Sequence, residues 1–234
     1  MSASETPAFD PFHDAVIGHH KTHAPRTIAD APIGERDLDG FTLNNVTPGP
    51  EIRAVQGQLV EVRLRNASVG AGVTLHWHGV DVPGGEDGVA GVTQDAVGVG
   101  HSFTYRFVVE QTGTFWYHSH QISHEQVRGG LLGALVLLPA DQAADPPIDV
   151  VALAHLYGGV RTTNGLDGDV RAAAPPGSTA RVRVINTDNG PMSVWVGGAP
   201  FRVVAVDGQD WHGPTAVRDT TVLVIAGGRV DLAV

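Results

Sequence analysis

The chain has 234 residues, of which 42% are hydrophobic and 17% charged, with 30 glycines, 15 prolines and a formal net charge of −10. This length allows one large domain or two of ordinary size, and the low charge content with many turn formers favours an all-β protein. An acidic chain without a block of lysine or arginine is repelled by phosphate backbones, which argues against nucleic-acid binding.

Residues 1–38 are polar, punctuated by proline and rich in histidine: His13, His19, His20 and His23. This composition predicts a tail or surface arm, and metal scavenging by its histidines is the alternative. The segment has no apolar run of the length that a signal peptide needs, and no stretch of the chain reaches the ~18 apolar residues of a membrane span. Either the protein stays inside the cell, or an export segment precedes this sequence.

From residue 41 the pattern changes to short strands separated by turns. Residues 58–65, QLVEVRLR, alternate apolar and polar side chains as a half-buried strand does. Turn-forming sequences at 48–50, 66–72 and 83–85 separate the apolar runs. Short strands at this density predict a Greek-key sandwich. Its strands are expected at 41–44, 51–55, 58–65, 73–78, 102–109, 113–118 and 131–138.

Residues 141–147 read as a linker between a first domain, 39–140, and a second domain, 148–234. The second domain is also rich in short apolar runs bounded by turn formers. Its strands are expected at 148–154, 180–186, 193–196, 201–206, 221–225 and 229–234.

The second domain repeats the first. Residues 57–66 align with 177–186 at an offset of 120, and HWHG at 76–79 aligns with VWVG at 194–197 after a two-residue gap. Valines replace both histidines in this alignment, so the second domain is predicted to be a copy without metal ligands.

The repeat also predicts an incomplete second sandwich. Residues 113–118 align with 228–233, after which the first domain continues to the strand at 131–138. The second domain is therefore predicted to lack its final strand and to leave a sheet edge unpaired, as in a truncated chain.

Two histidine pairs carry the chemistry: His76 and His78 in HWHG, and His118 and His120 in YHSH. Side chains at i and i+2 of a strand point the same way, about 6.5–7 Å apart. If the pairs lie on neighbouring strands, four imidazoles face one space. The chain has no cysteine, and an all-nitrogen cluster suits copper or zinc. A single pair would more simply be core histidines with satisfied hydrogen bonds.

The sequences around these pairs resemble the multicopper oxidases, a laccase-like and metallo-oxidase family, over roughly residues 41–234. The resemblance rests on GVTLHWHGV, VPGGEDGVAGVTQ, TGTFWYHSHQ and GGLLGALVLLP. It implies two cupredoxin-like Greek-key β-sandwich domains. It also implies a type 2 copper on His76, one type 3 copper on His78, and the type 3 pair on His118 and His120.

Asp87, nine residues after His78, matches a family aspartate that hydrogen-bonds water near the type 2 copper and helps deliver protons to reduced oxygen. The alternative for Asp87 is an ordinary turn aspartate in an Asp-Gly pair. His101, His124, His155 and His212 are not predicted to bind metal.

The chain departs from the family in having no H-C-H run and no type 1 copper cysteine, so it resembles the first domain and most of the second domain of a three-domain oxidoreductase. The intact enzyme would oxidise a phenol, an aromatic amine or a metal ion by single electrons and reduce O2 to water at a trinuclear copper cluster. This chain would supply half of that cluster and would be inactive alone. The missing C-terminal domain, or another chain, would be its partner, and the family implies an extracytoplasmic location.

Three other functions compete with this one, and a fourth is disfavoured. A copper-binding protein without turnover would use the same four histidines, and a subunit completed by another chain would need that chain's ligands. Copper nitrite reductase also has repeated cupredoxin domains, but HWHG with YHSH fits the oxidases better. A zinc hydrolase is disfavoured because no glutamate stands at metalloprotease spacing.

Overall fold

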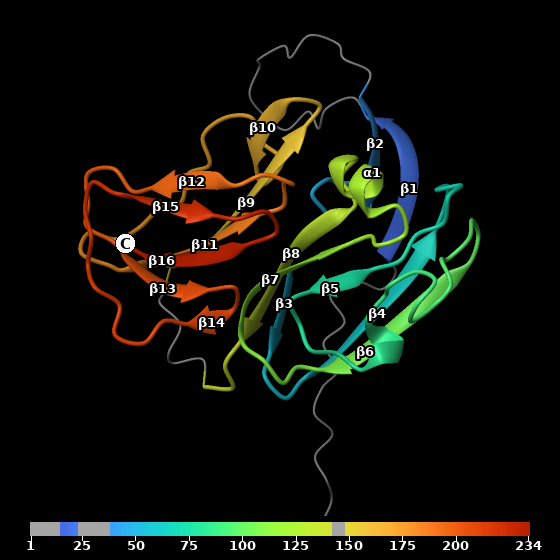
Figure 1. Cartoon of the computed structure of the whole chain (residues 1–234), viewed down its shortest axis with the longest axis horizontal. Helices are drawn as coiled ribbons and strands as arrows, with labels where there is room; N and C mark the ends of the chain where they lie inside the picture. The colour runs from blue at the N-terminus through green and yellow to red at the C-terminus, as the bar shows by residue number, and fades with distance from the viewer. Residues whose placement is uncertain (1–14, 23–37, 142–147) are drawn as a thin grey trace, which may run out of the picture.

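The computed structural model describes residues 15–22, 38–141 and 148–234, which form two strand-rich units side by side (Figure 1). The first unit has two four-stranded sheets. One has the order β2 (Leu38–Leu43), β1 (Ala15–Thr22), β4 (Leu59–Asn66), β6 (Ser102–Val108). The other has the order β3 (Ile52–Val55), β8 (Leu132–Leu138), β7 (Gly113–His118), β5 (His76–His78).

The second unit has a six-stranded and a two-stranded sheet. The larger has the order β10 (Val160–Thr163), β9 (Ile148–Tyr157), β11 (Ala180–Asn186), β16 (Arg229–Ala233), β13 (Arg202–Val206), β14 (Gln209–Asp210). The smaller pairs β12 (Met192–Trp195) with β15 (Thr221–Val224). Helical structure in the described ranges is limited to α1 (Ser123–Arg128) and the 3-10 turn η1 (Gly84–Glu86), and neither is long enough to cross a membrane. The predicted all-β class is confirmed.

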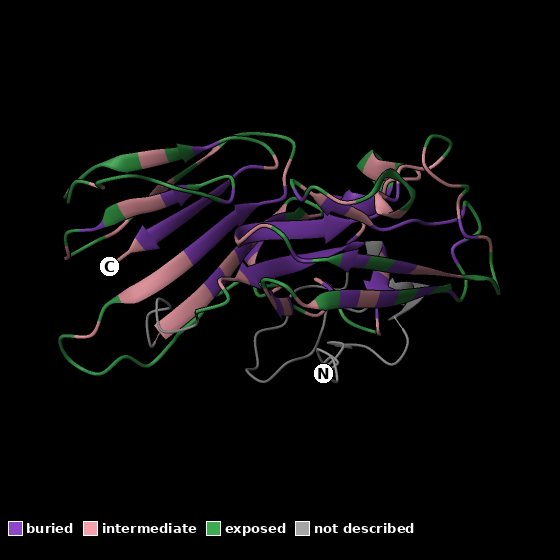
Figure 2. Cartoon of the chain, turned by 90° about the horizontal axis from the view of Figure 1, so that it is seen from below, coloured by how far each residue is buried: buried purple, intermediate pink, exposed green. Residues whose placement is uncertain are grey.

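Burial explains the sequence patterns of these strands. In β4 the apolar side chains of Val60, Val62 and Leu64 are at most 1% exposed and face the core between the two sheets of the first unit. β8 has no such alternation, because it is buried on both faces. One face packs on that core, and the other packs with Val151 and Leu153 of the second unit. The buried strands therefore run through the middle of the molecule (Figure 2).

Residues 15–22 differ from the surface arm predicted for 1–38. They form β1, which pairs antiparallel with β2 and parallel with β4. In the second unit β9 pairs in the same way with β10 and β11. Each unit thus opens with a hairpin whose first strand lies beside its long central strand. His19 and His20 lie in β1, whereas His13, His23 and the linker residues 142–147 are outside the described residues. The predicted domain limits stay a prediction.

The buried asparagines at the ends of β4 and β11 show how the repeat is built. Asn66 Nδ2 donates to the Val97 carbonyl at 2.8 Å, and Asn186 Nδ2 donates to the Val224 carbonyl at 3.1 Å. The backbone N–H of Asn66 donates to His101 at 3.1 Å, and that of Asn186 donates to Gly228 at 3.0 Å. The loop before β6 therefore corresponds to the loop before β16.

The predicted alignment of 113–118 with 228–233 is wrong, as the pairing of the strands shows. β16 pairs with β11 as β6 pairs with β4, so its counterpart is β6 and not β7. Among residues 148–234 no strand follows β16. Both β7 and the final strand β8 are therefore without a counterpart in the described part of the second unit.

The alignment of HWHG with VWVG is also wrong, by one residue. Val73 bridges Val97 in the first unit, and Met192 pairs with Val224 in the second, so Met192 corresponds to Val73. His76 then corresponds to Trp195. Trp77 is 0% exposed, whereas Trp195 is 67% exposed.

A one-residue shift moves every side chain of a strand to the other face. Val194 and Val196 accordingly pack in the second unit's core, at positions that correspond to Leu75 and Trp77. The valines do not stand where the histidines stand.

A buried polar network joins the two units. Thr114 in β7 donates to Asp231 at 2.7 Å, and Arg183 donates to Thr114 at 3.0 Å. Arg183 also donates to Asp149 at 2.6 Å, and Arg53 in β3 donates to the other oxygen of Asp149 at 2.7 Å. Because charges and hydroxyls buried together need these partners, the network fixes how β3 and β7 sit against the second unit.

Candidate metal centre

β5 and β7 bring the two histidine pairs together. The strands are antiparallel, with His76 opposite His118 and His78 opposite Trp116. His120 lies two residues beyond the end of β7. The ring centroid of His76 is 6.1 Å from that of His78, 5.3 Å from that of His118 and 5.2 Å from that of His120. The four imidazole rings therefore lie together, as neighbouring strands require, and the compact group of ligand nitrogens is that of His76, His78 and His118.

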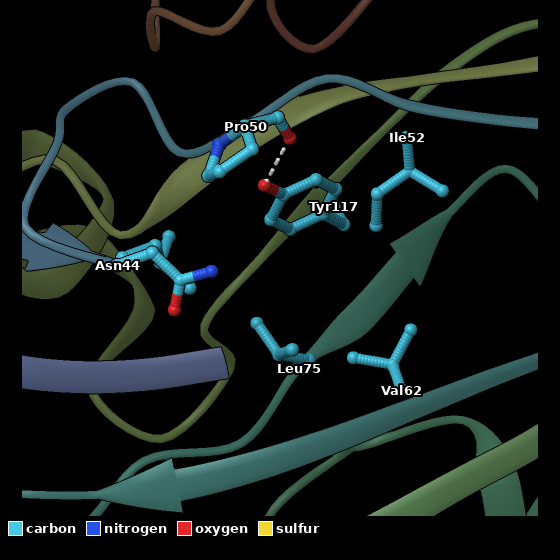
Figure 3. A pocket seen from close by; sticks show the side chains of 7 residues that line it. Asn44, Pro50, Ile52, Val62, Leu75 and Tyr117 are labelled. Atoms are coloured by element: carbon cyan, nitrogen blue, oxygen red, sulfur yellow. Dashed lines mark hydrogen bonds between the residues drawn. The ribbon is translucent and has the colours of Figure 1, made fainter. Parts of the chain in front are cut away.

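Trp77, between His76 and His78, and Tyr117, directly before His118, face the opposite side and anchor both strands. Trp77 packs against Tyr105 and Phe107, and its indole Nε1 donates to the Glu86 carbonyl at 2.9 Å. The Tyr117 hydroxyl donates to the Pro50 carbonyl at 2.6 Å in a small apolar cavity (Figure 3). Because Trp77 and Tyr117 are fixed in the core, the histidines that alternate with them are held on the opposite face of the sheet.

Ser119 anchors the YHSH motif in the same way. It is 0% exposed, and its hydroxyl donates to the side-chain oxygen of Gln126 in α1. The backbone N–H of His120 donates to the Thr74 hydroxyl at 3.2 Å. These bonds continue the strand-like alternation past the end of β7, so His118 and His120 project to the same side.

In His76 and His118, a hydrogen bond to a backbone carbonyl decides which ring nitrogen keeps a lone pair for a metal ion. Nδ1 of His76 lies 2.8 Å from the Asp87 carbonyl, and Nδ1 of His118 lies 2.9 Å from the Ser119 carbonyl. A carbonyl only accepts, so Nδ1 carries the hydrogen in both rings and Nε2 keeps its lone pair. This arrangement, in which a hydrogen bond on one nitrogen orients the other, is typical of histidines that bind metals.

His78 offers its other nitrogen to the same space. Its Nδ1 lies 3.3 Å from Nε2 of His118. The ligand nitrogens of His76, His78 and His118 all lie within 4.8 Å of one another. Metal–nitrogen bonds of about 2.0–2.1 Å at a tetrahedral angle separate two ligands by about 3.3–3.4 Å. The His78–His118 separation therefore fits two ligands of one ion.

Burial keeps these imidazoles neutral. Burial, with a smaller contribution from the positive charge of Arg229, lowers the pKa of His78 to about 4. Burial likewise lowers the pKa of His118 to about 3. Both rings are therefore unprotonated at neutral pH, which is the form that binds a metal ion.

Asp87 lies beside His76. Its Oδ1 is 3.2 Å from Nδ1 of His76, and its side chain is 30% exposed. The backbone of the loop that carries Asp87 lies against the chain just before β5. A Cβ added to Gly88 would come within 1.8 Å of the Leu75 carbonyl oxygen, so a side chain there would clash. The structure thus brings the predicted aspartate into direct contact with a histidine of the cluster.

Comparison with known proteins agrees with this geometry. A family model of multicopper oxidases matches residues 28–142. Laccase-1 of Botryotinia fuckeliana is 30% identical over 222 residues, which cover 83% of this chain and 39% of that protein. The blue copper oxidase of Nitrosomonas europaea superposes with a TM-score of 0.81 at 25% identity, covering 94% of this chain and 74% of that one. The chain belongs to the multicopper oxidase family.

The family assignment confirms the predicted cupredoxin-like sandwich, and the members of this family are oxidoreductases. A second curated relative matches over a shorter stretch at higher identity. The L-ascorbate oxidase of Cucumis sativus is 42% identical over 106 residues, which are 44% of this chain and 18% of that protein. The chain spans less than half the length of these two curated multicopper oxidases.

Four other histidines whose side chains the structure describes lie outside the cluster. His155 is 1% exposed and its Nδ1 lies 2.8 Å from the Thr187 hydroxyl, as in a core histidine with satisfied hydrogen bonds. His124 lies near the surface with its Nδ1 2.8 Å from Asn189. His101 and His212 are exposed.

Sequence reasoning missed Trp116, which lies against two of the clustered histidines. Its ring centroid is 4.6 Å from that of His78 and 4.4 Å from that of His118. The signal was available, because strand alternation in TFWYHSH puts Trp116 on the face of His118 and His120.

Proposed function

We propose that the four histidines hold copper and that this multicopper oxidase chain supplies half of a cluster at which O2 is reduced to water. His76 would bind a type 2 copper. His78 and His118 would share one type 3 copper, and His120 would bind the other. The observation that carries this proposal is the 3.3 Å separation between Nδ1 of His78 and Nε2 of His118, which matches two ligands of one ion.

The donor chemistry also supports copper. Imidazole nitrogen suits copper and zinc, and the protein family binds copper. Bound copper would accept electrons one at a time and pass them to O2. The chain's own contribution is to hold neutral imidazoles at fixed positions, which its buried strands and carbonyl hydrogen bonds favour.

Asp87 is the residue to which we assign proton transfer. Its carboxylate contacts the His76 ring, and its partial exposure gives it access to water. A carboxylate in this position can take a proton from solvent at Oδ1 and release it toward the cluster. The contact with His76 favours this role over that of an ordinary turn aspartate.

The finer points of the function follow from the same proposal. Further histidines and the electron-entry copper would come from another cupredoxin domain or another chain. The reducing substrate would be a phenol, an aromatic amine or a metal ion, and the location would be extracytoplasmic. His76, His78 and His120 are each only partly buried, which leaves room for a partner's ligands to approach.

Copper titration of the purified chain tests the proposal. We expect Cu(II) binding with an electron paramagnetic resonance spectrum of nitrogen ligation, and we expect His118→Ala to abolish most of it. His212→Ala, a change at an exposed histidine outside the cluster, is the matched control. Equal binding by the wild type and His118→Ala would contradict the proposal.

Oxygen uptake separates the proposed enzyme from a copper-binding protein without turnover. The copper-loaded chain should consume no O2 with a phenol or an aromatic amine until a partner with the remaining ligands is added. If addition of a type 1 copper domain of the family never restores oxygen uptake, the storage or delivery role is the better description.

A further inference from the structure

Trp116 forms a flat surface shared by the two histidines that face one another. Its indole is inclined by 26° to the His78 ring and by 30° to the His118 ring, at centroid distances of 4.6 and 4.4 Å. Trp116 is 4% exposed. Because interiors are close-packed, neither imidazole can turn far about its side-chain torsions without displacing the indole.

The second unit holds this surface in place. Nε1 of Trp116 donates to the Gly227 carbonyl at 3.2 Å, and Nη1 of Arg229 donates to the same oxygen at 3.3 Å. The backbone of Gly227 also lies against the edge of His78. A Cβ added there would come within 3.2 Å of Cε1 and 3.3 Å of Nε2 of that ring. The backbone of the turn after β15 therefore forms a wall, in the sense of a close packing surface, against the Cε1–Nε2 edge of His78.

Arg229 ties this wall to the strands that carry the histidines. Its Nε donates to the Thr114 carbonyl in β7 at 3.2 Å, and its guanidinium carbon lies 5.6 Å from the centre of the Phe115 ring. A Cβ on Gly79, the residue after His78, would come within 2.5 Å of Nη2 of Arg229. Gly79 has a φ of 84°, which favours glycine at this close approach.

We propose that Trp116, Gly227 and Arg229 are positioning residues, through which the second unit fixes the imidazoles of His78 and His118 for copper. None of the three offers a side-chain lone pair to a metal at neutral pH, so each acts through the histidines. Groups that orient metal ligands typically contribute about 10- to 100-fold to metal affinity. This inference rests on the proposed function, since it concerns the orientation of the copper ligands.

A pair of glycine substitutions separates contact with His78 from backbone strain. Gly227 has a φ of 69° and Gly213 a φ of 64°, but an added Cβ on Gly213 would meet no atom within 4 Å. We expect Gly227→Ala to weaken Cu(II) binding about 10-fold and to alter the resonance spectrum of the bound copper. Gly213→Ala should keep the wild-type affinity and spectrum.

Substitutions at Trp116 and Arg229 test the other two positioning residues. Trp116→Leu should weaken Cu(II) binding about 10-fold, and Trp116→Phe should restore part of it, because phenylalanine keeps a flat ring against both imidazoles. Arg229→Gln should weaken binding, whereas Arg202→Gln, at an exposed position on neighbouring β13, should not. Circular dichroism of each variant checks folding. If Trp116→Leu does not fold, the two glycine variants decide.

Two results would overturn the inference in distinguishable ways. Unchanged Cu(II) affinity and spectra in folded Gly227→Ala and Arg229→Gln would remove the positioning role and leave the proposed function intact. Equal Cu(II) binding by the wild type and His118→Ala would remove the proposed function and this inference with it.

Discussion

The two units share the order of four strands in one sheet and a buried asparagine, but among the described residues only the first gathers histidines. In β5 the apolar Trp77 faces the core and His76 and His78 face away from it. In β12 and the residue after it, Val194 and Val196 face the core and Trp195 faces outward. The sequences HWHG and VWVG look alike, yet their tryptophans point to opposite faces: Trp77 into the core and Trp195 to solvent. Likeness of motif is therefore a weaker guide than the register in which a strand pairs.

The largest effect expected from this comparison concerns the two tryptophans. Trp77→Ala should lower the free energy of unfolding by about 3–5 kcal/mol, since it empties a fully buried site. Trp195→Ala should change it by about 0.5 kcal/mol or less, as is usual at the surface. Denaturant unfolding of both variants measures the difference. Similar losses would restore the alignment of the two motifs that the strand register contradicts.

The next largest effect concerns the polar network between the units. Asp231→Ala should lower the free energy of unfolding by about 3 kcal/mol, because Arg183 and Thr114 lose their buried acceptor. Asp210→Ala is the control, since this carboxylate lies 3.5 Å from Arg181 but is 82% exposed. Thermal unfolding compares the two. A small loss for Asp231→Ala would mean that this carboxylate contributes little to holding the units together.

The paired asparagines test the repeat itself. Asn66→Ala and Asn186→Ala should each lower the free energy of unfolding by about 2 kcal/mol, because each leaves buried backbone carbonyls without a donor. Asn189→Ala, at an exposed position, should have little effect. Clearly unequal losses at the two buried sites would show that the matching hydrogen bonds do not stabilise the two units alike.

The smallest effect is a dependence on pH. Burial alone would raise the pKa of Asp149, but hydrogen bonds from Arg183 and Arg53 lower it below its ordinary value. A carboxylate with a lowered folded-state pKa stabilises the protein above the unfolded pKa of about 4. That stabilisation should be lost as the pH falls from there through the folded pKa. In urea unfolding at several pH values, Asp149→Asn should show a weaker loss in this acidic range than the wild type.

Much of the fold could be read from local patterns. Alternation in QLVEVRLR indicated β4, and the continuous apolar run LLGALVLL indicated a strand that the structure buries on both faces. β1 was not predicted, because its polar and histidine-rich sequence AVIGHHKT has no strand-like alternation over its second half. It becomes a strand by pairing with β2 and β4, which are distant in sequence, and no local pattern reports such a partner.

The site was also predictable in part. The spacing of His76, His78, His118 and His120 indicated that the four rings would face one space if the strands were neighbours, and they are. The wall behind His78 could not be predicted, since it is built from the backbone of Gly227, about 150 residues away in sequence. A carbonyl oxygen and a missing side chain leave no chemical signature in a motif.

The burial of β7 has a consequence for how the proposed metal site would take up an ion. All six of its residues are buried, with the first unit's core on one side and the second unit on the other. Its backbone pairs with β5 and β8 within the first unit. Its amide hydrogens should therefore exchange with solvent only when that sheet opens, and the strand end beside His118 has little room to move. An ion bound there would have to accept the geometry that His118 already has, so the site would select among metals by the coordination geometry that each prefers.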